Sequence, residues 1–450
     1  MIKGKKIPKL KGNTFFSSGN AMRKNPLSFI ISLGISYPEI IHFKFLHLDI
    51  VLISDPVLVR DVLQTNQKYY IKNLMYEHLK LLLGEGLVTS EGKVWKRQRK
   101  LIQPSFHKHY INNLFNEMLN CTNEMIRDWK AEAVALGKID FAVEMNNITL
   151  QIIGKTMLSA DFKNESKSVG ESLTYLLKAL EKRVLHGINF PMWVPVPANT
   201  QFKNKRKVLD AIIYKLISDR RKTGNQKGDL LDMMMESRYE DNGEAMPDNL
   251  LRDELMTVFL AGHETTATAL AWTFYFISKH PEVYKKLRKE VKEVVGDDEL
   301  TFQHLQQLKY TKACLNESMR LRPPVWVIGR RATEDNMLGD YLIKKDTTVL
   351  MSPYIVHRHK DYWKNPEIFD PERWETEEVK QMDKFAYFPF AAGPRMCIGN
   401  NFALLEADII ITKIVQQFDF SYIGKEEPEM EPTLTLRVKN GMPMQIRNLS

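Results

Sequence analysis

Phe390-Ala-Ala-Gly-Pro-Arg-Met-Cys397-Ile-Gly399 is the stretch of sequence on which the interpretation of the whole chain depends. It places one cysteine in a turn between two glycines, Gly393 and Gly399, and an apolar helical pattern follows from Asn401 to Leu405. Backbone N–H groups in such a turn and at a helix N-terminus stabilise a thiolate, the form of cysteine that binds metals. A buried structural cysteine before a helix is the alternative, and it is the commoner role of a lone cysteine.

The spacing favours the metal-binding interpretation. Phe-x-x-Gly-x-Arg-x-Cys-x-Gly is the haem-ligand signature of the cytochrome P450 superfamily, and the chain matches it at Phe390, Gly393, Arg395, Cys397 and Gly399. Positions as specific as these coincide by chance in on the order of one chain in ten thousand. The chain therefore resembles a haem-thiolate monooxygenase. The resemblance implies that Cys397 is the axial ligand of haem b (iron protoporphyrin IX), with Phe390, Arg395 and Gly399 also contacting the cofactor.

Length and composition allow one large domain or two or three ordinary ones, and the resemblance implies the first. The 450 residues are 44% hydrophobic, which is ample for a large core, and we expect a single haem domain over residues 1–450. Cys121, Cys314 and Cys397 lie far apart, so neither a disulfide framework nor a structural zinc site is predicted, and a reducing cytoplasm is expected. Neither a signal peptide nor a membrane span is predicted. The chain resembles soluble, bacterial-type members, such as the haem domains of fatty-acid hydroxylases, and eukaryotic lipid hydroxylases.

A formal net charge of +9 indicates a surface that attracts anionic partners. No nucleic-acid motif accompanies it, so nucleic acid is not an expected partner. Basic residues are dense at Lys93–Lys100 and at Lys203–Lys207, and either run can be a solvated helix face. In the fold that the resemblance implies, the first run lies near the cysteine side of the haem. We expect it to dock an electron donor such as a ferredoxin or flavodoxin, which works with its own reductase.

The longest predicted helix runs from Pro247-Asp248 to Lys279 and is apolar on almost every side, which predicts burial. The run Ala261-Gly-His-Glu-Thr-Thr266 interrupts it with polar residues. A helix kink, with Thr265 bonding back to a carbonyl near Gly262, is one explanation. A zinc-protease motif is excluded, because Ala267 stands where a second histidine would be needed.

The same run matches the oxygen-activation signature of the P450 superfamily, Ala/Gly-Gly-x-Asp/Glu-Thr-Thr/Ser. The resemblance implies that Thr265 and Glu264 are catalytic: the hydroxyl holds the water that delivers protons to bound dioxygen, and the carboxyl relays protons from solvent. A cysteine thiolate on the other haem face favours O–O cleavage. Ala261 is small enough for haem and substrate to approach the helix.

Trp95 and Arg99 stand at i and i+4 and so share one helical face. An amphipathic surface helix would explain the spacing, but in the family this pair donates to a haem propionate. The resemblance extends the same role to Lys72 and to Arg330. We choose Arg330 over Arg331, because strand parity sends the two side chains to opposite faces.

Glu317 and Arg320 stand three residues apart on a predicted helix from Tyr310 to Leu321. Alone, such a pair is most often a surface ion pair worth a few tenths of a kcal/mol, roughly. With Arg373, it resembles the structural Glu/Arg/Arg triad that holds the region around the cysteine loop.

The fold implied is mainly α with small β-sheets, with haem between the long central helix and the cysteine loop. We expect helices over most of Ile111 to Met235, with a break at Asn189–Pro197 that resembles the loop above the substrate pocket. Other expected elements are strands at Ile40–Phe45, Ile50–Ile53, Trp326–Arg330 and Tyr341–Met351, a helix from Asp55-Pro56 to Leu63, a covering loop at Gly84–Val88, a turn at Asp241-Asn-Gly243, and a final hairpin made by Thr433–Val438 and the Asn440-Gly441 turn.

The predicted reaction is monooxygenation of a small apolar molecule of the lipid, fatty-acid or terpenoid class, with O2 as co-substrate and two electrons from an external partner. Val88, Ala261 and Val325 are expected to line the substrate pocket. Two alternatives stay open: a haem-thiolate enzyme that uses peroxide or rearranges a hydroperoxide, and a haem-binding sensor without turnover. Peroxide users commonly depart from the acid/threonine pair, which is intact here at Glu264 and Thr265.

Overall fold

A computed structural model describes residues 4–10, 15–163, 166–186, 189–224, 226–239 and 243–449. Its helices are α1 (Phe15–Lys24), α2 (Pro26–Ser36), α3 (Pro56–Arg60), α4 (Leu74–Leu83), α5 (Gly92–Ile102), α6 (Lys108–Asn113), α7 (Phe115–Asp128), α8 (Val134–Leu136), α9 (Phe141–Leu158), α10 (Ser166–His186), α11 (Pro197–Thr223), α12 (Leu230–Glu236), α13 (Asp248–Lys279), α14 (Pro281–Val294), α15 (Phe302–Gln307), α16 (Lys309–Leu321), α17 (Pro353–Val356), α18 (Glu377–Gln381) and α19 (Asn400–Gln417).

The strands are short and form separate small sheets. They are β1 (Ile40–Phe45), β2 (Leu48–Ile53), β3 (Tyr70–Lys72), β4 (Lys138–Asp140), β5 (Ile328–Ala332), β6 (Asn336–Leu338), β7 (Tyr341–Ile343), β8 (Thr348–Met351), β9 (Phe418–Tyr422), β10 (Met430–Pro432), β11 (Leu436–Val438) and β12 (Pro443–Asn448). The largest sheet has the order β1-β2-β8-β5-β3, and β2 pairs with β8 in parallel. The predicted class, mainly α with small sheets, is confirmed.

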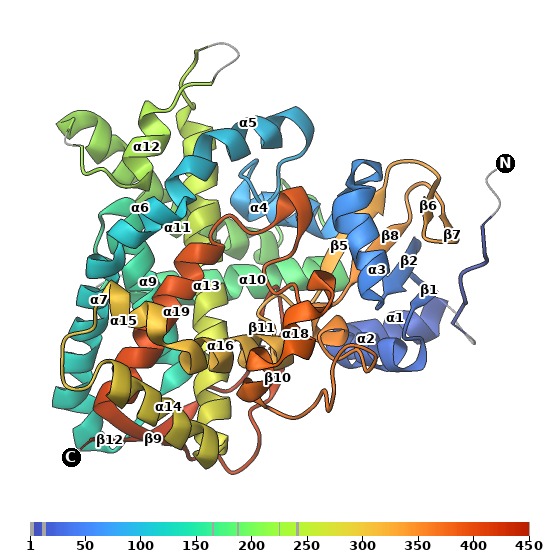
Figure 1. Ribbon diagram of the computed structural model, residues 1–450. Helices are drawn as coiled ribbons and strands as arrows, with labels where there is room; N and C mark the ends of the chain where they lie inside the picture. The colour runs from blue at the N-terminus through green and yellow to red at the C-terminus, as the bar shows by residue number, and fades with distance from the viewer. Residues whose placement is uncertain are drawn as a thin grey trace.

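Helix α13 passes through the middle of the molecule, as Figure 1 shows. It packs against α9, α11, α16 and α19, and its side chains are buried on nearly every face. Even the indole N–H of Trp272 finds a buried acceptor, the carbonyl of Leu436 at 2.8 Å. This confirms the burial that its apolar sequence predicts.

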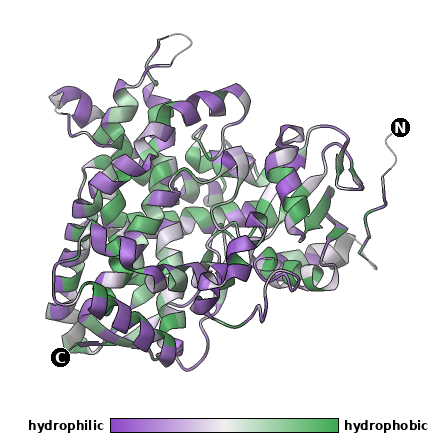
Figure 2. Ribbon diagram, viewed as in Figure 1, coloured by the Kyte–Doolittle hydropathy of each residue, from purple (hydrophilic) through white to green (hydrophobic). Residues whose placement is uncertain are grey.

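The helices are bounded by residues that suit their ends. The Asp140 carboxylate accepts the N–H groups of Ala142 and Val143 and so caps α9, and Pro281 opens α14 at its first turn. Hydrophobic residues gather between the helices, and hydrophilic residues cover their outer faces (Figure 2). In the described part of the chain, no helix has both the length and the apolar character needed to cross a membrane.

Two strand predictions are wrong. Tyr341–Met351 is not one strand but two, because the chain turns at Lys344–Thr347, where Asp346 adopts a left-handed backbone with φ of 66°. Strand β7 then pairs with β6, whereas β8 joins the large sheet.

The final hairpin also differs from the prediction. Leu436–Val438 pairs with Met430–Pro432, and the turn lies at Thr433–Thr435, where the N–H of Thr433 donates to the Thr435 carbonyl at 3.0 Å. The Asn440-Gly441 segment instead leads into β12, and the N–H of Met442 donates to the Asp140 carboxylate at 2.9 Å. The contact between Met442 and Asp140, which are far apart in the sequence, therefore determines that the Asn440-Gly441 segment leads into β12 instead of closing a hairpin.

Other boundaries shift by a few residues. Helix α3 ends at Arg60 and continues as a wider turn over Asp61–Thr65, and β5 begins at Ile328 rather than at Trp326. The break at Asn189–Pro197 is confirmed as the segment between α10 and α11. Asp241 and Asn242 of the predicted turn lie outside the described residues.

Candidate active site

A central cavity of about 300 Å³ lies between α13 and the segment that carries Cys397. Cys397 follows the short turn Gly393–Arg395 and precedes α19, and its N–H donates to the Phe390 carbonyl at 2.9 Å. Gly393 is required there: its φ is 69°, and a Cβ would lie 1.9 Å from the Leu63 carbonyl oxygen. The glycine-bearing cysteine turn is therefore present as predicted.

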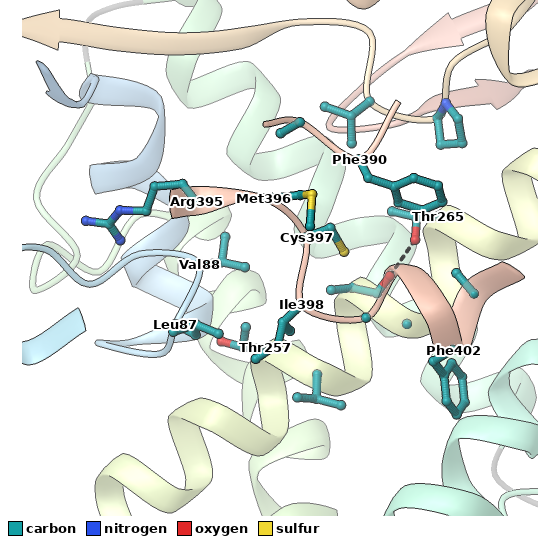
Figure 3. A pocket seen from close by; sticks show the side chains of 18 of the residues that line it. Leu87, Val88, Thr257, Thr265, Phe390, Arg395, Met396, Cys397, Ile398 and Phe402 are labelled. Carbon is teal, nitrogen blue, oxygen red and sulfur yellow. Dashed lines mark hydrogen bonds between the residues drawn. The ribbon is translucent and has the colours of Figure 1, made fainter. Parts of the chain in front are cut away.

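The side chain of Cys397 projects from its loop toward the helix that carries Thr265 (Figure 3). Burial raises the pKa of this thiol, whereas the N–H of Gly399 and the guanidinium of Arg99 act to lower it. Both of these groups favour the thiolate once a cation shares the site. The alternative of an inert cysteine packed in the core does not hold, because the thiol lines an open cavity.

Positive charge is concentrated on one wall of the cavity. Lys72, Arg330 and Arg395 all line it, and burial, followed by the charge of Arg395, lowers the pKa of Lys72 to about 7. The Lys72 ammonium meets carbonyl oxygens, of Ser90 at 2.8 Å and of Leu87 at 3.3 Å. Within the described residues, the one hydrogen bond of the Arg330 guanidinium goes to the neighbouring Gly329 carbonyl at 2.9 Å.

The acidic groups near this wall do not balance these cations. Glu91 pairs with Arg395, and Glu254 is the acidic residue that lines the cavity. Burial raises the pKa of Glu254 to about 8, which favours its neutral form. Buried cations without counter-charges are costly, so this wall fits a ligand that brings anionic groups.

A haem fits this donor set: an apolar macrocycle, two propionates for the cationic wall and an iron for the cysteine. Arg330 faces the cavity, whereas Arg331 is exposed and pairs with Asp346 at 2.9 Å, so the two side chains diverge as strand parity predicts. Phe390, Gly399 and Ala261 also line the cavity.

Trp95 and Arg99 both line the cavity from α5, but they make different contacts. The Trp95 ring lies 3.7 Å from the Arg395 guanidinium, as in a cation–π pair. Arg99 donates to the Met396 carbonyl at 2.9 Å, next to Cys397 in the chain. Arg99 thus ties α5 to the cysteine loop in this structure.

Thr265 faces the cavity from α13, and its hydroxyl donates to the Ala261 carbonyl at 2.6 Å. This is the backbone bond expected of a mid-helix threonine, made one residue before Gly262. Gly262 itself allows close packing, since a Cβ there would lie 2.6 Å from a methyl group of Ile153.

Glu264 turns away from the central cavity. It accepts a hydrogen bond from the Thr435 hydroxyl at 2.7 Å, and the Arg437 guanidinium lies 3.7 Å away. Burial raises the pKa of Glu264, and Arg437 and Thr435 oppose that shift. Sequence reasoning missed Thr435 and Arg437, because nothing in the local pattern of β11 indicates that it reaches α13.

The predicted covering loop at Gly84–Val88 is held against α13 by two consecutive carboxylates. Asp253 accepts the N–H of Glu85 at 2.9 Å, and Glu254 accepts the N–H of Leu87 at 2.9 Å. Neither acid was predicted as a site residue. Two consecutive acidic residues early in an apolar helix were the available signal.

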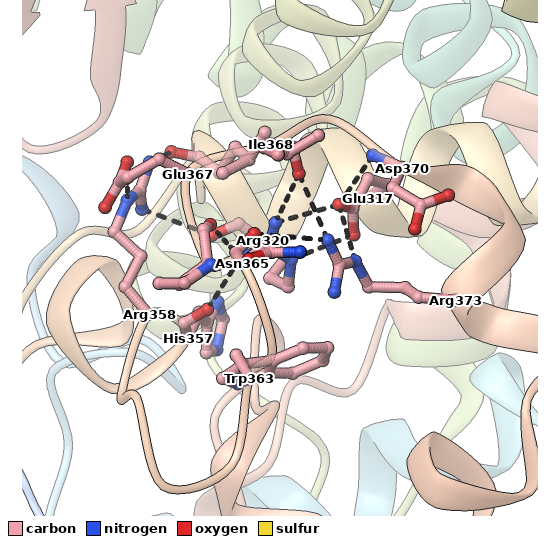
Figure 4. Close-up of polar contacts among 12 residues, drawn as sticks. Glu317, Arg320, His357, Arg358, Trp363, Asn365, Glu367, Ile368, Asp370 and Arg373 are labelled. Atoms are coloured by element: carbon pink, nitrogen blue, oxygen red, sulfur yellow. Dashed lines mark hydrogen bonds and ion pairs between the residues drawn. The ribbon is translucent and has the colours of Figure 1, made fainter.

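The Glu317 cluster is a buried network rather than a surface ion pair (Figure 4). Arg320 donates to both Glu317 oxygens at 2.8 Å, and Arg373 donates to one of them at 2.9 Å. Further donors are the indole of Trp374 at 3.1 Å and the N–H of Asp370 at 3.0 Å. Arg320 also donates to carbonyls of the segment 357–368, so the cluster fastens the chain that leads toward the cysteine loop.

A second chamber of about 300 Å³ adjoins the first. The central cavity and the second chamber share Val88, Ala261, Thr265 and Val325 as lining residues. The three residues predicted to line a pocket therefore lie where the two spaces meet. The walls of this chamber come from α2, α4, α10, the β1–β2 hairpin and the β10–β11 turn.

Comparison with known proteins identifies relatives over nearly the whole chain. The model of a family described as Cytochrome P450 matches residues 8–445. The chain is 30% identical to Protein LUTEIN DEFICIENT 5, chloroplastic, of Arabidopsis thaliana, over 98% of this chain and 76% of that protein. It is 29% identical to Cyclooctat-9-en-7-ol 5-monooxygenase of Streptomyces melanosporofaciens (88% and 86% covered). It is also 29% identical to Leukotriene-B4 omega-hydroxylase 3 of Mus musculus (94% and 83% covered).

Proposed function

The chain belongs to the cytochrome P450 family, and we propose that within it the protein is a monooxygenase that inserts one oxygen atom of O2 into an apolar substrate. Family membership makes it an oxidoreductase with a haem-thiolate iron cofactor, O2 as co-substrate and an external electron donor. The observation that carries the proposal is the cavity itself, in which the Cys397 thiol projects toward the helix that carries Thr265.

We assign haem b as the cofactor and Cys397 as its axial ligand. Lys72, Trp95, Arg99, Arg330 and Arg395 would meet the propionate side, and Phe390, Gly399 and Ala261 would contact the macrocycle. Bound haem would supply the redox chemistry that activates O2 with two electrons. The protein contributes the thiolate, the apolar walls that exclude bulk water, and the groups that deliver protons.

Thr265 and Glu264 are the proposed proton-delivery residues. Because the Thr265 hydroxyl donates its proton to the Ala261 carbonyl, its lone pairs are free to accept a hydrogen bond from a water in the cavity. Glu264 precedes Thr265 on α13, and burial raises the pKa of its carboxyl, which favours the protonated form that can donate a proton. Two protons and two electrons convert the second oxygen atom to water.

The substrate is proposed to be a lipid, fatty acid or terpenoid, bound where Val88, Ala261 and Val325 line both spaces. Two relatives are named for cyclooctat-9-en-7-ol and leukotriene B4, which supports an apolar substrate. We further propose a single domain over residues 1–450, located in the cytoplasm, where its free cysteines Cys121 and Cys314 stay reduced.

A ferredoxin or flavodoxin is the proposed electron donor, docked on Lys93, Lys96 and Lys100. These side chains are exposed on α5, and Arg99 of the same helix contacts the cysteine loop. Changing Lys93 and Lys96 to Glu should slow reduction about tenfold at low salt, and high salt should remove the difference. Lys203 and Lys207, changed to Glu on α11, are the charge-matched control. Equal reduction rates in both variants would contradict the docking site.

The first test is the carbon monoxide difference spectrum of the dithionite-reduced protein. A red-shifted Soret band that Cys397→Ser abolishes would support thiolate ligation, and a band at the shorter wavelength of a neutral ligand would contradict it. Product formation that requires a reduced pyridine nucleotide and a ferredoxin system distinguishes the monooxygenase from the alternatives. A peroxide user would turn over without reductant, and a haem sensor would form no product from any substrate.

A further inference from the structure

The charged side chains that line the second chamber are all acidic. Its lining contains two acidic side chains, Glu181 and Glu264, and among the described residues no lysine or arginine lines it. The rest of the wall is mainly aliphatic and aromatic, including Leu177, Leu180 and Trp326. An anionic ligand in this chamber would meet no positive charge.

Glu264 is already engaged by Thr435 and Arg437, but Glu181 is not engaged. In the described part of the structure, the Glu181 carboxylate accepts no hydrogen bond and forms no ion pair. The charged groups that act on it are Lys178, Lys182 and Glu431, and Lys178 is itself paired with Glu431 at 2.9 Å. Glu181 is only partly exposed, and burial raises the pKa of its carboxyl.

The other titratable group of the wall, His78, supplies no positive charge. Burial, and then the charge of Arg183, lowers its pKa, so the imidazole is neutral at physiological pH. Arg183 itself does not line the chamber. Its guanidinium is bonded to Asn199 and lies 3.1 Å from the Met192 sulfur, on the segment between α10 and α11.

These charges discriminate between the substrate classes named above. A carboxylate that leaves water for this chamber would lose its hydration without gaining a cation, and Glu181 would repel it. A neutral hydroxyl loses far less hydration free energy than a carboxylate when it moves from water into the chamber. It can also donate a hydrogen bond to the unpartnered Glu181 carboxylate. The same chamber that rejects a fatty acid therefore accepts an alcohol of the same length.

We propose that the chamber selects an uncharged lipid-sized alcohol, isoprenoid or straight-chain, and that Glu181 accepts the hydrogen bond of its hydroxyl. This rests on the proposed monooxygenase function, because it takes the chamber as the place where the substrate lies. Glu181 is then a specificity-determining residue on α10, whereas Thr265, on α13 at the other boundary of the chamber, lies at the reacting end. The hydroxyl group and the oxidised carbon lie at different ends of the substrate.

The test compares matched pairs of ligands on the haem-loaded protein. Dodecanol and dodecanoic acid, and farnesol and farnesoic acid, are titrated at pH 8 while the Soret shift that accompanies substrate binding is followed. We expect each alcohol to bind at least about tenfold more tightly than its acid. Equal affinities, or tighter binding of the acids, would overturn the proposal.

Variants assign the selectivity to Glu181. Glu181→Lys should reverse the preference within each pair, and Glu181→Gln should weaken rejection of the acids while keeping a hydrogen-bonding group. Glu171→Lys makes the same charge change at an exposed position of α10 that does not line the chamber, and it should leave the preference unchanged. A shift of equal size in Glu171→Lys would show a long-range charge effect and contradict the role of Glu181.

Binding and turnover separate this inference from the function on which it rests. A protein that oxidises substrates with reductant but binds acids as well as alcohols contradicts the inference alone. A protein that prefers alcohols in the Soret titration but forms no product with any electron donor contradicts the monooxygenase proposal alone.

Discussion

Two buried charge clusters of this protein differ in how completely their charges are paired. At the Glu317 cluster, two guanidiniums and an indole donate to one carboxylate, and the remaining donors reach carbonyl oxygens. On the cavity wall, the Lys72 ammonium and the Arg330 guanidinium donate to carbonyl oxygens, and among the described residues neither forms an ion pair with a carboxylate. A cluster whose cations share a buried carboxylate holds the fold together, whereas buried cations without a carboxylate partner indicate a site that awaits an anionic ligand.

The largest expected effect comes from breaking the paired cluster. Glu317→Ala leaves Arg320 and Arg373 buried without a counter-charge, and should lower the free energy of unfolding by about 3–5 kcal/mol. Urea denaturation measures this change. Glu377→Ala removes an exposed pair with Lys380 at 2.9 Å and should change stability by less than about 1 kcal/mol. Similar losses in both variants would contradict the contrast between buried and exposed pairs.

Removing a cation from the unpaired cluster should have a smaller effect of a different kind. Arg330→Met should leave the stability of haem-free protein unchanged or slightly raised, because the arginine has no counter-charge there, but should weaken haem retention about tenfold. Transfer of haem to an excess of apomyoglobin measures the retention. Arg331→Met, on the exposed side of the same strand, is the matched control and should retain haem normally.

The pH dependence of the free energy of unfolding tests the protonation of the charged groups on the cavity wall. The pKa of Lys72 is about 7 in the folded protein and 10.5 ordinarily, so the unfolded chain binds more protons between these values. Stability of the haem-free protein should therefore rise with pH across this window. Glu254, with its pKa raised to about 8 from 4.5, contributes the opposite slope between those two values.

The Lys72 slope is thus clearest between about pH 8 and 10, above the range of Glu254. Lys72→Met should remove this rise of stability with pH. Urea denaturation midpoints at several pH values measure it. Lys93→Met, on exposed α5, should leave it in place. A slope that survives in Lys72→Met would show that other groups titrate in this range.

The smallest expected effect concerns Glu264, whose pairing lies between the two extremes. Arg437 acts to lower the pKa of this carboxyl, so Arg437→Gln should raise it and move the acidic limb of the kcat–pH profile to higher pH by about one unit or less. Arg447→Gln changes an exposed arginine on β12 and should leave the profile in place. An unmoved limb in Arg437→Gln would mean that Glu264 does not control the rate.

Most helices could be predicted from the sequence, because their boundaries depend on local signals. The apolar length of α13, the proline at the start of α14 and the break near Pro197 each lie where the pattern placed them. The strands were harder. Tyr341–Met351 has a continuous strand-like pattern, but its division depends on Asp335, which accepts the N–H of Lys345 at 2.8 Å across the intervening turn.

For the candidate site, the sequence by itself determined which residues belong to the signatures of the family. Cys397, Thr265, Trp95, Arg99 and Arg330 come from separate segments of the chain, and all of them line one cavity.

The tertiary structure alone decided how those residues are paired and what surrounds them. It turned Glu264 toward Thr435 and Arg437, set Asp253 and Glu254 against the covering loop, and left Glu181 unpartnered on a wall without cations. These relations join residues that are far apart in the chain. Burial and charge pairing depend on the whole packed molecule, and no local pattern of residues encodes them.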